Sequence, residues 1–159
     1  LLGNPVLYER SAEVAEEDRA TLGALIEDLH DTLLDFRCRH GAGRAIAAPQ
    51  IGARKRLIYL HIGEPMVFIN PVLTPAGPEL MELWDDCMSF PDLLVRVRRH
   101  RKCRLTFSDA SWRPRQIELE GDLSELLQHE YDHLEGILAV SRAIGARSFA
   151  LRSQRGWLG

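Results

Sequence analysis

The run Gln128-His129-Glu130-Tyr131-Asp132-His133 constrains this chain more than any other feature, because it places two histidines four residues apart. In an α-helix, positions i and i+4 lie on one face one turn apart, so both imidazoles can reach a single metal ion if the run is helical. Glu130, beside the first histidine, can reach a water on such an ion. The H-E-x-x-H pattern therefore predicts a metal-binding helix. The competing interpretation is a polar helix with two surface histidines, which the flanking Asp132 and Glu135 permit.

A catalytic metal site of this type needs a third protein ligand and an open fourth position. No histidine follows His133, which excludes the common variant with a downstream histidine ligand. Asp132 and Glu135 are close in sequence, and Cys87 offers a thiolate. An ordinary buried small hydrophobe is the commoner role of a free cysteine. The residue pattern alone therefore leaves the third ligand open.

Length and composition predict one compact domain spanning residues 1–159. The formal net charge of -3 argues against a general nucleic-acid or membrane partner. Only three cysteines are present, an odd and sparse count that predicts a reducing, cytoplasmic compartment. No apolar run approaches the ~20 residues that span a bilayer, and residues 1–5 lack the pattern of a secretion signal.

Hydrophobic periodicity predicts an α+β fold. Apolar residues recur at helical spacing between Glu13 and Arg39, which predicts one long N-terminal helix. A second helix begins at Asp122, where Asp122-Leu-Ser-Glu125 resembles a capping box, and it carries the H-E-x-x-H run. Short apolar or alternating runs predict mostly antiparallel strands around this late helix, at residues 57–60, 66–69, 80–84, 95–98, 103–107 and 116–120. Residues 141–159 carry no clear pattern.

Three stretches, in order, resemble the peptide deformylase family over nearly the whole chain. Gln128 to Gly136 reads Q-H-E-Y-D-H-L-E-G and is similar to the family motif QHExDHLxG at every specified position. Asp85 to Ser89 reads D-D-C-M-S and resembles EGCLS. Gly43 to Gln50 reads G-R-A-I-A-A-P-Q and resembles GxGxAAxQ. One partial motif is weak evidence, but three motifs with matching order and spacing identify the chain as a member of this family.

The resemblance implies the roles of six residues. The metal ligands are expected to be Cys87, His129 and His133. They are expected to hold one divalent ion per chain, with water in the fourth position. Family members use Fe²⁺ in the cell and accept Ni²⁺, Co²⁺ or Zn²⁺. Glu130 is expected to move the proton, while the Gln50 side-chain amide and the Met88 backbone N–H are expected to share the charge on the formyl oxygen.

The function that the resemblance implies is metal-dependent hydrolysis of an N-formyl group, most readily from N-formylmethionyl peptides, in protein biosynthesis. The products are formate and a free amine. A basic segment, Arg96 to Arg104, suggests a weak ribosome contact, but its alternation with apolar residues favours the solvated face of strands. Neither a membrane nor a specific nucleic-acid partner is expected.

The chain departs from the family pattern around the expected substrate site. Ala45 and Asp86 replace glycines, and Asp85 replaces the usual glutamate. Leu94 aligns with an arginine that the family uses on the substrate backbone. The expected substrate-contact positions are Gly43, Arg44, Ala45, Asp86, Leu94, Asp122 and Glu125.

Three of these positions, Arg44, Asp122 and Glu125, fall where the family lines a methionine pocket with apolar side chains. Burying unpaired charge is costly, so a charged pocket suits a thioether poorly. In the alternative interpretation, Asp122 and Glu125 only cap the helix and Arg44 points to solvent. The sequence leaves both interpretations open.

Two further functions therefore stand beside the first. One is a deformylase-like hydrolase of another N-formyl or short N-acyl substrate, small and charged. The other is an inactive metal-binding protein with a structural or partner-binding role. Glu130 and Gln50 weigh against the inactive protein, because a purely structural metal site requires neither residue.

Overall fold

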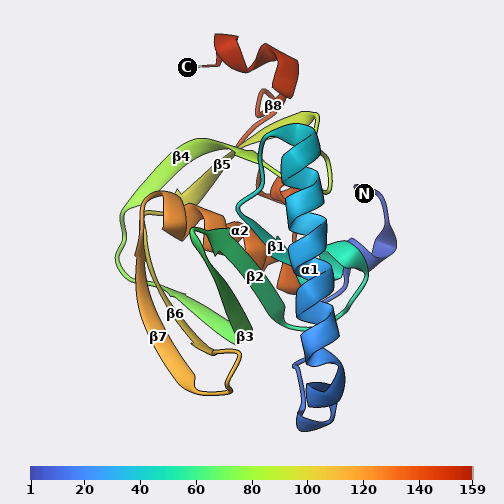
Figure 1. Ribbon diagram of the computed structural model, residues 1–159. Helices are drawn as coiled ribbons and strands as arrows, with labels where there is room; N and C mark the ends of the chain where they lie inside the picture. Colours follow the sequence, from blue (N-terminus) through green and yellow to red (C-terminus); the bar gives the residue numbers. More distant parts are fainter. Residues whose placement is uncertain (159) are drawn as a thin grey trace.

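Two antiparallel sheets and two long helices form the α+β fold of the computed structural model, which describes residues 1–158 (Figure 1). Gly159, the last residue of the predicted domain, lies outside the described residues. The first sheet has the order β1-β2-β3-β6-β7 and comprises β1 (Ala45–Ala47), β2 (Leu57–Ile62), β3 (Glu64–Pro75), β6 (Lys102–Ser108) and β7 (Pro114–Glu120). The second sheet has the order β4-β5-β8 and comprises β4 (Leu80–Asp86), β5 (Leu93–His100) and β8 (Phe149–Leu151).

The predicted strands are present, and most are longer than their apolar patterns. In β5, Val95 and Val97 are buried while Arg96 and Arg98 are exposed, as the alternation predicts. Arg99 departs from the expected solvated face, because only 3% of its side chain is exposed. The basic segment is therefore a solvated strand face with one buried cation.

The N-terminal helix α1 spans Arg19–His40, so the predicted start at Glu13 is wrong. The side chain of Asn70 holds the preceding chain extended: its Oδ1 accepts from the Val14 N–H at 2.8 Å, and its Nδ2 donates to the Val14 carbonyl at 2.9 Å. The helix contacts β1 and β2 of the first sheet. Its buried face consists of Leu22, Leu29, Leu33 and Phe36.

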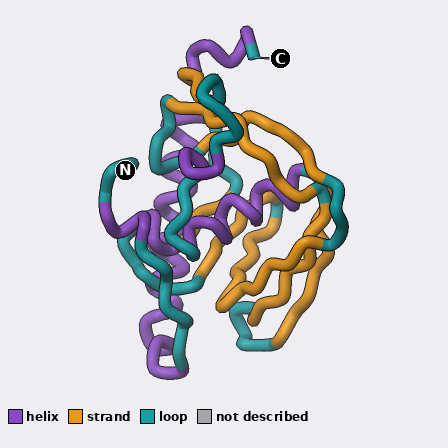
Figure 2. Tube along the Cα trace, turned by 180° about the vertical axis from the view of Figure 1, so that it is seen from behind, coloured by secondary structure: helices purple, strands orange, loops and turns teal. Residues whose placement is uncertain are grey.

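The late helix α2 spans Asp122–Leu134 and contacts β1 and β7 of the first sheet and β5 of the second. Figure 2, viewed from behind, shows this helix crossing the strands. The predicted capping box is wrong, because Gly121 is the N-cap and no side chain within the described residues caps the helix. Instead, the Ser124 hydroxyl donates to the His100 carbonyl at 2.9 Å, and the Glu125 carboxylate pairs with Arg44.

The N-terminal segment packs against the end of α2. Gly136 follows this helix with φ +70°, and a Cβ there would lie 2.5 Å from the Tyr8 carbonyl oxygen. The Ser11 N–H donates to the Leu134 carbonyl at 2.8 Å, and the Leu2 N–H donates to the Ser89 carbonyl at 2.8 Å. The first residues therefore bind both the helix and the loop after β4.

Residues 141–158, for which the sequence predicted no structure, contain the end of one 3₁₀ helix, η4 (Ala139–Arg142), then strand β8 and a second 3₁₀ helix. The strand β8 pairs with β5, with Leu151 opposite Leu93. The second 3₁₀ helix, η5 (Arg152–Trp157), stands outside the sheets at the top of Figure 1. Within residues 1–158, no helix combines the length and apolar character needed to cross a membrane.

Candidate metal centre

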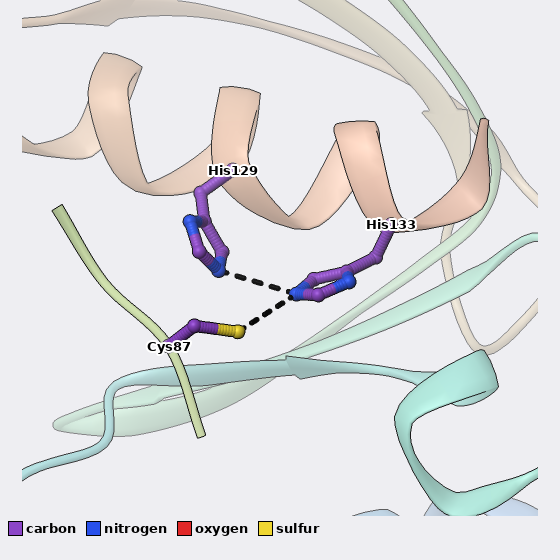
Figure 3. A group of neighbouring side chains, drawn as sticks. All are labelled: Cys87, His129 and His133. Carbon is purple, nitrogen blue, oxygen red and sulfur yellow. Dashed lines mark hydrogen bonds between the residues drawn. The ribbon is translucent and has the colours of Figure 1, made fainter. Parts of the chain in front are cut away.

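Three buried side chains converge where the loop after β4 meets helix α2. Cys87 follows the last residue of β4, while His129 and His133 lie one turn apart on α2 (Figure 3). The Nε2 atom of His133 lies 3.2 Å from the Cys87 Sγ and 3.2 Å from the His129 Nε2. All three ligand atoms lie within 4.8 Å of one another.

The spacing of these atoms suits a metal ion. Ligands of a tetrahedral site with bonds of about 2.0–2.3 Å lie roughly 3.3–3.8 Å from each other, close to the observed separations. One thiolate and two imidazoles are donors for zinc, iron or nickel. The two carboxylates that the sequence left as alternative ligands are held elsewhere: Arg99 and Arg142 bind Asp132, and Arg10 and Arg56 bind Glu135.

A buried ion-pair network lies behind the metal ligands. The Asp85 Oδ1 lies 2.9 Å from the His129 Nδ1, and its Oδ2 accepts from the Arg99 Nη2 at 2.8 Å. Arg99 also donates to Asp132, which Arg142 binds at 2.6 Å. Burial alone raises the pKa of Asp85, but the charges on His129 and Arg99 outweigh it and lower that pKa to about 2. The ionised Asp85 therefore fixes the orientation of the His129 ring.

Glu130 is a buried carboxylate aimed into a cavity beside the metal ligands. Among the described residues, its Oε2 has no hydrogen-bond partner. Burial raises the pKa of Glu130 to about 7, and the charges on Asp85 and Glu125 act in the same direction, against those of His129 and Arg44. A carboxyl group with such a pKa can both accept and release a proton near neutral pH.

The side-chain amide of Gln50 is oriented by the backbone. Its Oε1 accepts from the Ala47 N–H at 2.9 Å, which turns its Nε2 toward the Ser89 Oγ at 3.2 Å and the Cys87 Sγ at 3.7 Å. The Met88 N–H donates to no other group within residues 1–158. Both donors therefore lie beside the metal ligands. Ser89 is a buried neighbour that the sequence analysis missed.

A cavity of about 680 Å³ opens beside Cys87, His129 and Glu130. The expected substrate-contact positions that line it are Gly43, Arg44, Ala45, Asp86, Asp122 and Glu125. Leu94 does not line the cavity: it is 1% exposed and pairs with Asp86 on one side and Ala150 on the other, inside the second sheet.

The charged pocket positions form an ion pair across the cavity wall. The Arg44 Nη2 lies 2.6 Å from the Glu125 Oε1, with 44% and 14% of the two side chains exposed. Burial raises the pKa of Glu125, and the Arg44 charge opposes this rise. Neither sequence interpretation is therefore complete, because Arg44 turns toward α2 and Glu125 binds it instead of capping the helix. Asp122 is exposed at the first turn of α2.

Comparisons with known proteins agree with this geometry. The family model described as polypeptide deformylase matches residues 1–148. The peptide deformylase of Thermotoga neapolitana is 32% identical over 155 residues, covering 97% of this chain and 91% of that relative. The solved peptide deformylase of Thermotoga maritima has a TM-score of 0.81 and 31% identity, covering 91% of this chain and 95% of that one. That of Legionella pneumophila has a TM-score of 0.80 and 34% identity, covering 89% and 82%.

The fold and the buried cysteine–histidine group define a metal-dependent amidohydrolase. The chain belongs to the peptide deformylase family, and its metal site is intact.

Proposed function

We propose that residues 1–159 act as one domain that removes the N-formyl group from N-formylmethionyl peptides, releasing formate and a free amine. The observation that supports this function is that Glu130 and Gln50 line one cavity together with Cys87 and His129, two of the three grouped ligand side chains. A metal site that only stabilised the fold would require neither the buried acid nor the oriented amide.

One divalent ion would be held by Cys87, His129 and His133. When bound, such an ion supplies Lewis-acid chemistry, polarising a carbonyl and making water more acidic. Fe²⁺ is our proposal for the native ion, supported by the family resemblance, with Ni²⁺, Co²⁺ or Zn²⁺ as replacements. The mixed thiolate and imidazole donors are compatible with all four. A reducing, cytoplasmic compartment is part of the proposal, because Cys87 must stay a free thiolate to bind the ion.

Glu130 carries the proton through both halves of the reaction. It takes a proton from the attacking water as the water oxygen bonds to the formyl carbon. It then delivers that proton to the departing amine nitrogen as the carbon–nitrogen bond breaks. General acid–base catalysis of this kind contributes about 10²–10⁴ in rate.

Gln50 and Met88 would stabilise the negative charge that develops on the formyl oxygen. The Ala47 N–H holds the Gln50 amide with its NH₂ group toward the metal ligands, so little reorganisation is required during the reaction. The Met88 N–H, which has no hydrogen-bond partner within residues 1–158 and is next to Cys87 in the chain, would provide a second donor.

A second substrate class is favoured by the Arg44–Glu125 ion pair. A substrate with a polar or charged first side chain could bind these two groups, whereas a thioether would have to pack against them. Contact with the ribosome has weaker support, because Arg96, Arg98 and Arg104 are paired with acidic side chains of the same sheets.

The experiment is formate release from formyl-Met-Ala and formyl-Gln-Ala by protein loaded anaerobically with iron or nickel, beside Glu130→Gln. We expect release from formyl-Met-Ala and its loss in the variant. Faster release from formyl-Gln-Ala would establish the second substrate class. Metal bound at one ion per chain with no release from either peptide would contradict the proposed function and favour an inactive metal-binding protein.

A further inference from the structure

The segment after residue 148 lies beyond the part of the chain that the family model matches, yet it forms part of the cavity wall. It contributes two guanidinium groups, Arg152 and Arg155, both on the 3₁₀ helix η5. A 3₁₀ helix has three residues per turn, so side chains three residues apart share one face. The two arginines therefore face the cavity together.

The interactions of Arg152 hold the helix η5 in place. Its Nη2 lies 2.7 Å from the Asp86 Oδ2, and its Nε donates to the Pro91 carbonyl at 2.6 Å. Its backbone N–H donates to the Asp92 carbonyl at 2.8 Å, directly after the pairing of β8 with β5. Arg152 thus anchors η5 to the end of β4 that leads into Cys87, and its charge is neutralised by Asp86.

Arg155 has a different environment. It is exposed at the cavity wall, and within residues 1–158 its guanidinium makes no ion pair and no hydrogen bond. The other two arginines of the wall are paired, Arg44 with Glu125 and Arg152 with Asp86. Asp122, a carboxylate of the same wall, forms no ion pair with Arg155 or with any other cation among the described residues. Among residues 1–158, Arg155 is thus the arginine of this cavity wall that has no ion-pair partner and is available to a ligand.

We propose that Arg155 determines substrate selectivity by binding a carboxylate of the peptide at the mouth of the cavity. This inference rests on the proposed deformylase function. The planar guanidinium presents paired N–H donors that match the two oxygens of a carboxylate. Arg152 is a positioning residue, because it fixes the helix from which Arg155 extends. The carboxylate is either the C-terminus of a short N-formyl peptide or an acidic side chain of a longer one.

The contact should appear in substrate binding rather than in the chemical step. Arg155 is carried by η5, whereas Glu130 and the histidine ligands are carried by α2. An interaction that is equally strong in the ground state and the transition state changes KM and leaves kcat unchanged. Because an exposed ion pair contributes little and is screened by salt, the expected preference is roughly fivefold and declines as salt is raised.

The test uses the metal-loaded protein with free-acid and C-terminally amidated forms of formyl-Met-Ala, formyl-Met-Ala-Ala and formyl-Met-Ala-Ala-Ala. A second arm compares amidated peptides that end in Glu or Gln, which separates an acidic side chain from a C-terminus. The variants are Arg155→Gln, Arg155→Lys and the control Arg147→Gln, an exposed arginine of the same region that does not line the cavity. Calorimetric binding of deformylated Met-Ala, as acid and amide, to the wild type and to each of these variants repeats the comparison without turnover.

We expect the wild type and Arg147→Gln to prefer the carboxylate about fivefold in kcat/KM and in binding. Arg155→Gln should abolish the preference through KM, and Arg155→Lys should retain part of it. Equal preference in wild type and Arg155→Gln, or no preference for a carboxylate in either arm, would overturn the inference. A binding preference that depends on Arg155 without formate release would support this site while contradicting the proposed function.

Discussion

The metal centre and the rim of the cavity are both held by ion pairs, but these pairs differ in burial. The rim is the part of the cavity wall formed by the pairs Arg44–Glu125 and Arg152–Asp86. Behind the metal ligands, Asp85 and Arg99 are each only 3% exposed. At the rim, the Arg44 and Arg152 side chains are 44% and 30% exposed. Removing one partner of a buried pair leaves an uncompensated charge and costs several kcal/mol, whereas an exposed pair contributes about 0–1 kcal/mol.

Because of this difference in burial, the groups proposed to catalyse the reaction and the groups proposed to select the substrate depend on different kinds of interaction. The centre is fixed by interactions that the fold needs, so substitutions there affect folding, metal binding or turnover. The rim is built from pairs that contribute little to stability, so its side chains can change with the substrate while the fold persists.

Arg99→Met should destabilise the protein by about 3–5 kcal/mol, because it leaves the buried carboxylates of Asp85 and Asp132 without their shared cation. Urea unfolding of the metal-free protein measures the effect. The matched control is Arg98→Met, which breaks an exposed pair with Glu82 and should cost less than about 1 kcal/mol. Similar losses of unfolding free energy in the two variants would show that buried and exposed ion pairs do not differ in their contribution to stability.

Gln50→Ala should lower kcat for formyl-Met-Ala by about 10²–10³, because one donor to the formyl oxygen is lost. Metal content should stay at one ion per chain, since Gln50 supplies no ligand. Gln116→Ala, an exposed glutamine on β7, serves as the control. A change confined to KM would show that Gln50 only binds substrate.

Asp85→Asn should weaken metal binding by about 10- to 100-fold, because the residue that orients His129 loses its charge. Competition with a chelator measures the affinity. The neighbouring substitution Asp86→Asn should leave the affinity unchanged, since Asp86 faces Arg152. Equal affinities in the two variants would show that Asp85 does not support the ligand.

The double substitution Arg44→Leu/Glu125→Leu should increase the preference for formyl-Met-Ala over formyl-Gln-Ala by about tenfold, because an apolar wall replaces an ion pair. The ratio of the two kcat/KM values measures it. Arg104→Leu/Glu118→Leu, an exposed pair between β6 and β7, is the control. An unchanged ratio would exclude the ion pair from substrate selection.

The fold class and the histidine pair could be predicted from sequence because both depend on local spacing. Helical and alternating patterns are visible in short windows, and positions i and i+4 meet on a helix wherever it lies. Cys87 required the family motif, because a lone cysteine carries no spacing signal. The start of α1 was predicted wrongly, because the Asn70 side chain that holds Val14 is far away in the sequence.

The rim could not be predicted in the same way. Arg44 and Glu125 are 81 residues apart, so no local pattern indicates their pairing. Arg99 lies on the same face of β5 as the buried Val95 and Val97, but a charged side chain within a basic run is expected to be solvated, and the carboxylates that allow its burial come from distant residues such as Asp132 on α2. Arg152 and Arg155 reach the cavity because β8 pairs with β5, and three strand residues give too short a pattern to recognise.

The most direct test of the account compares formate release from formyl-Met-Ala by Glu130→Gln and by Arg44→Leu/Glu125→Leu, with metal content measured in both. The account predicts one ion per chain in each protein, a loss of about 10²–10⁴ in kcat for Glu130→Gln, and retained turnover with altered selectivity for the double variant. Turnover that survives in Glu130→Gln and disappears in the double variant would place the reaction at the rim and contradict the account.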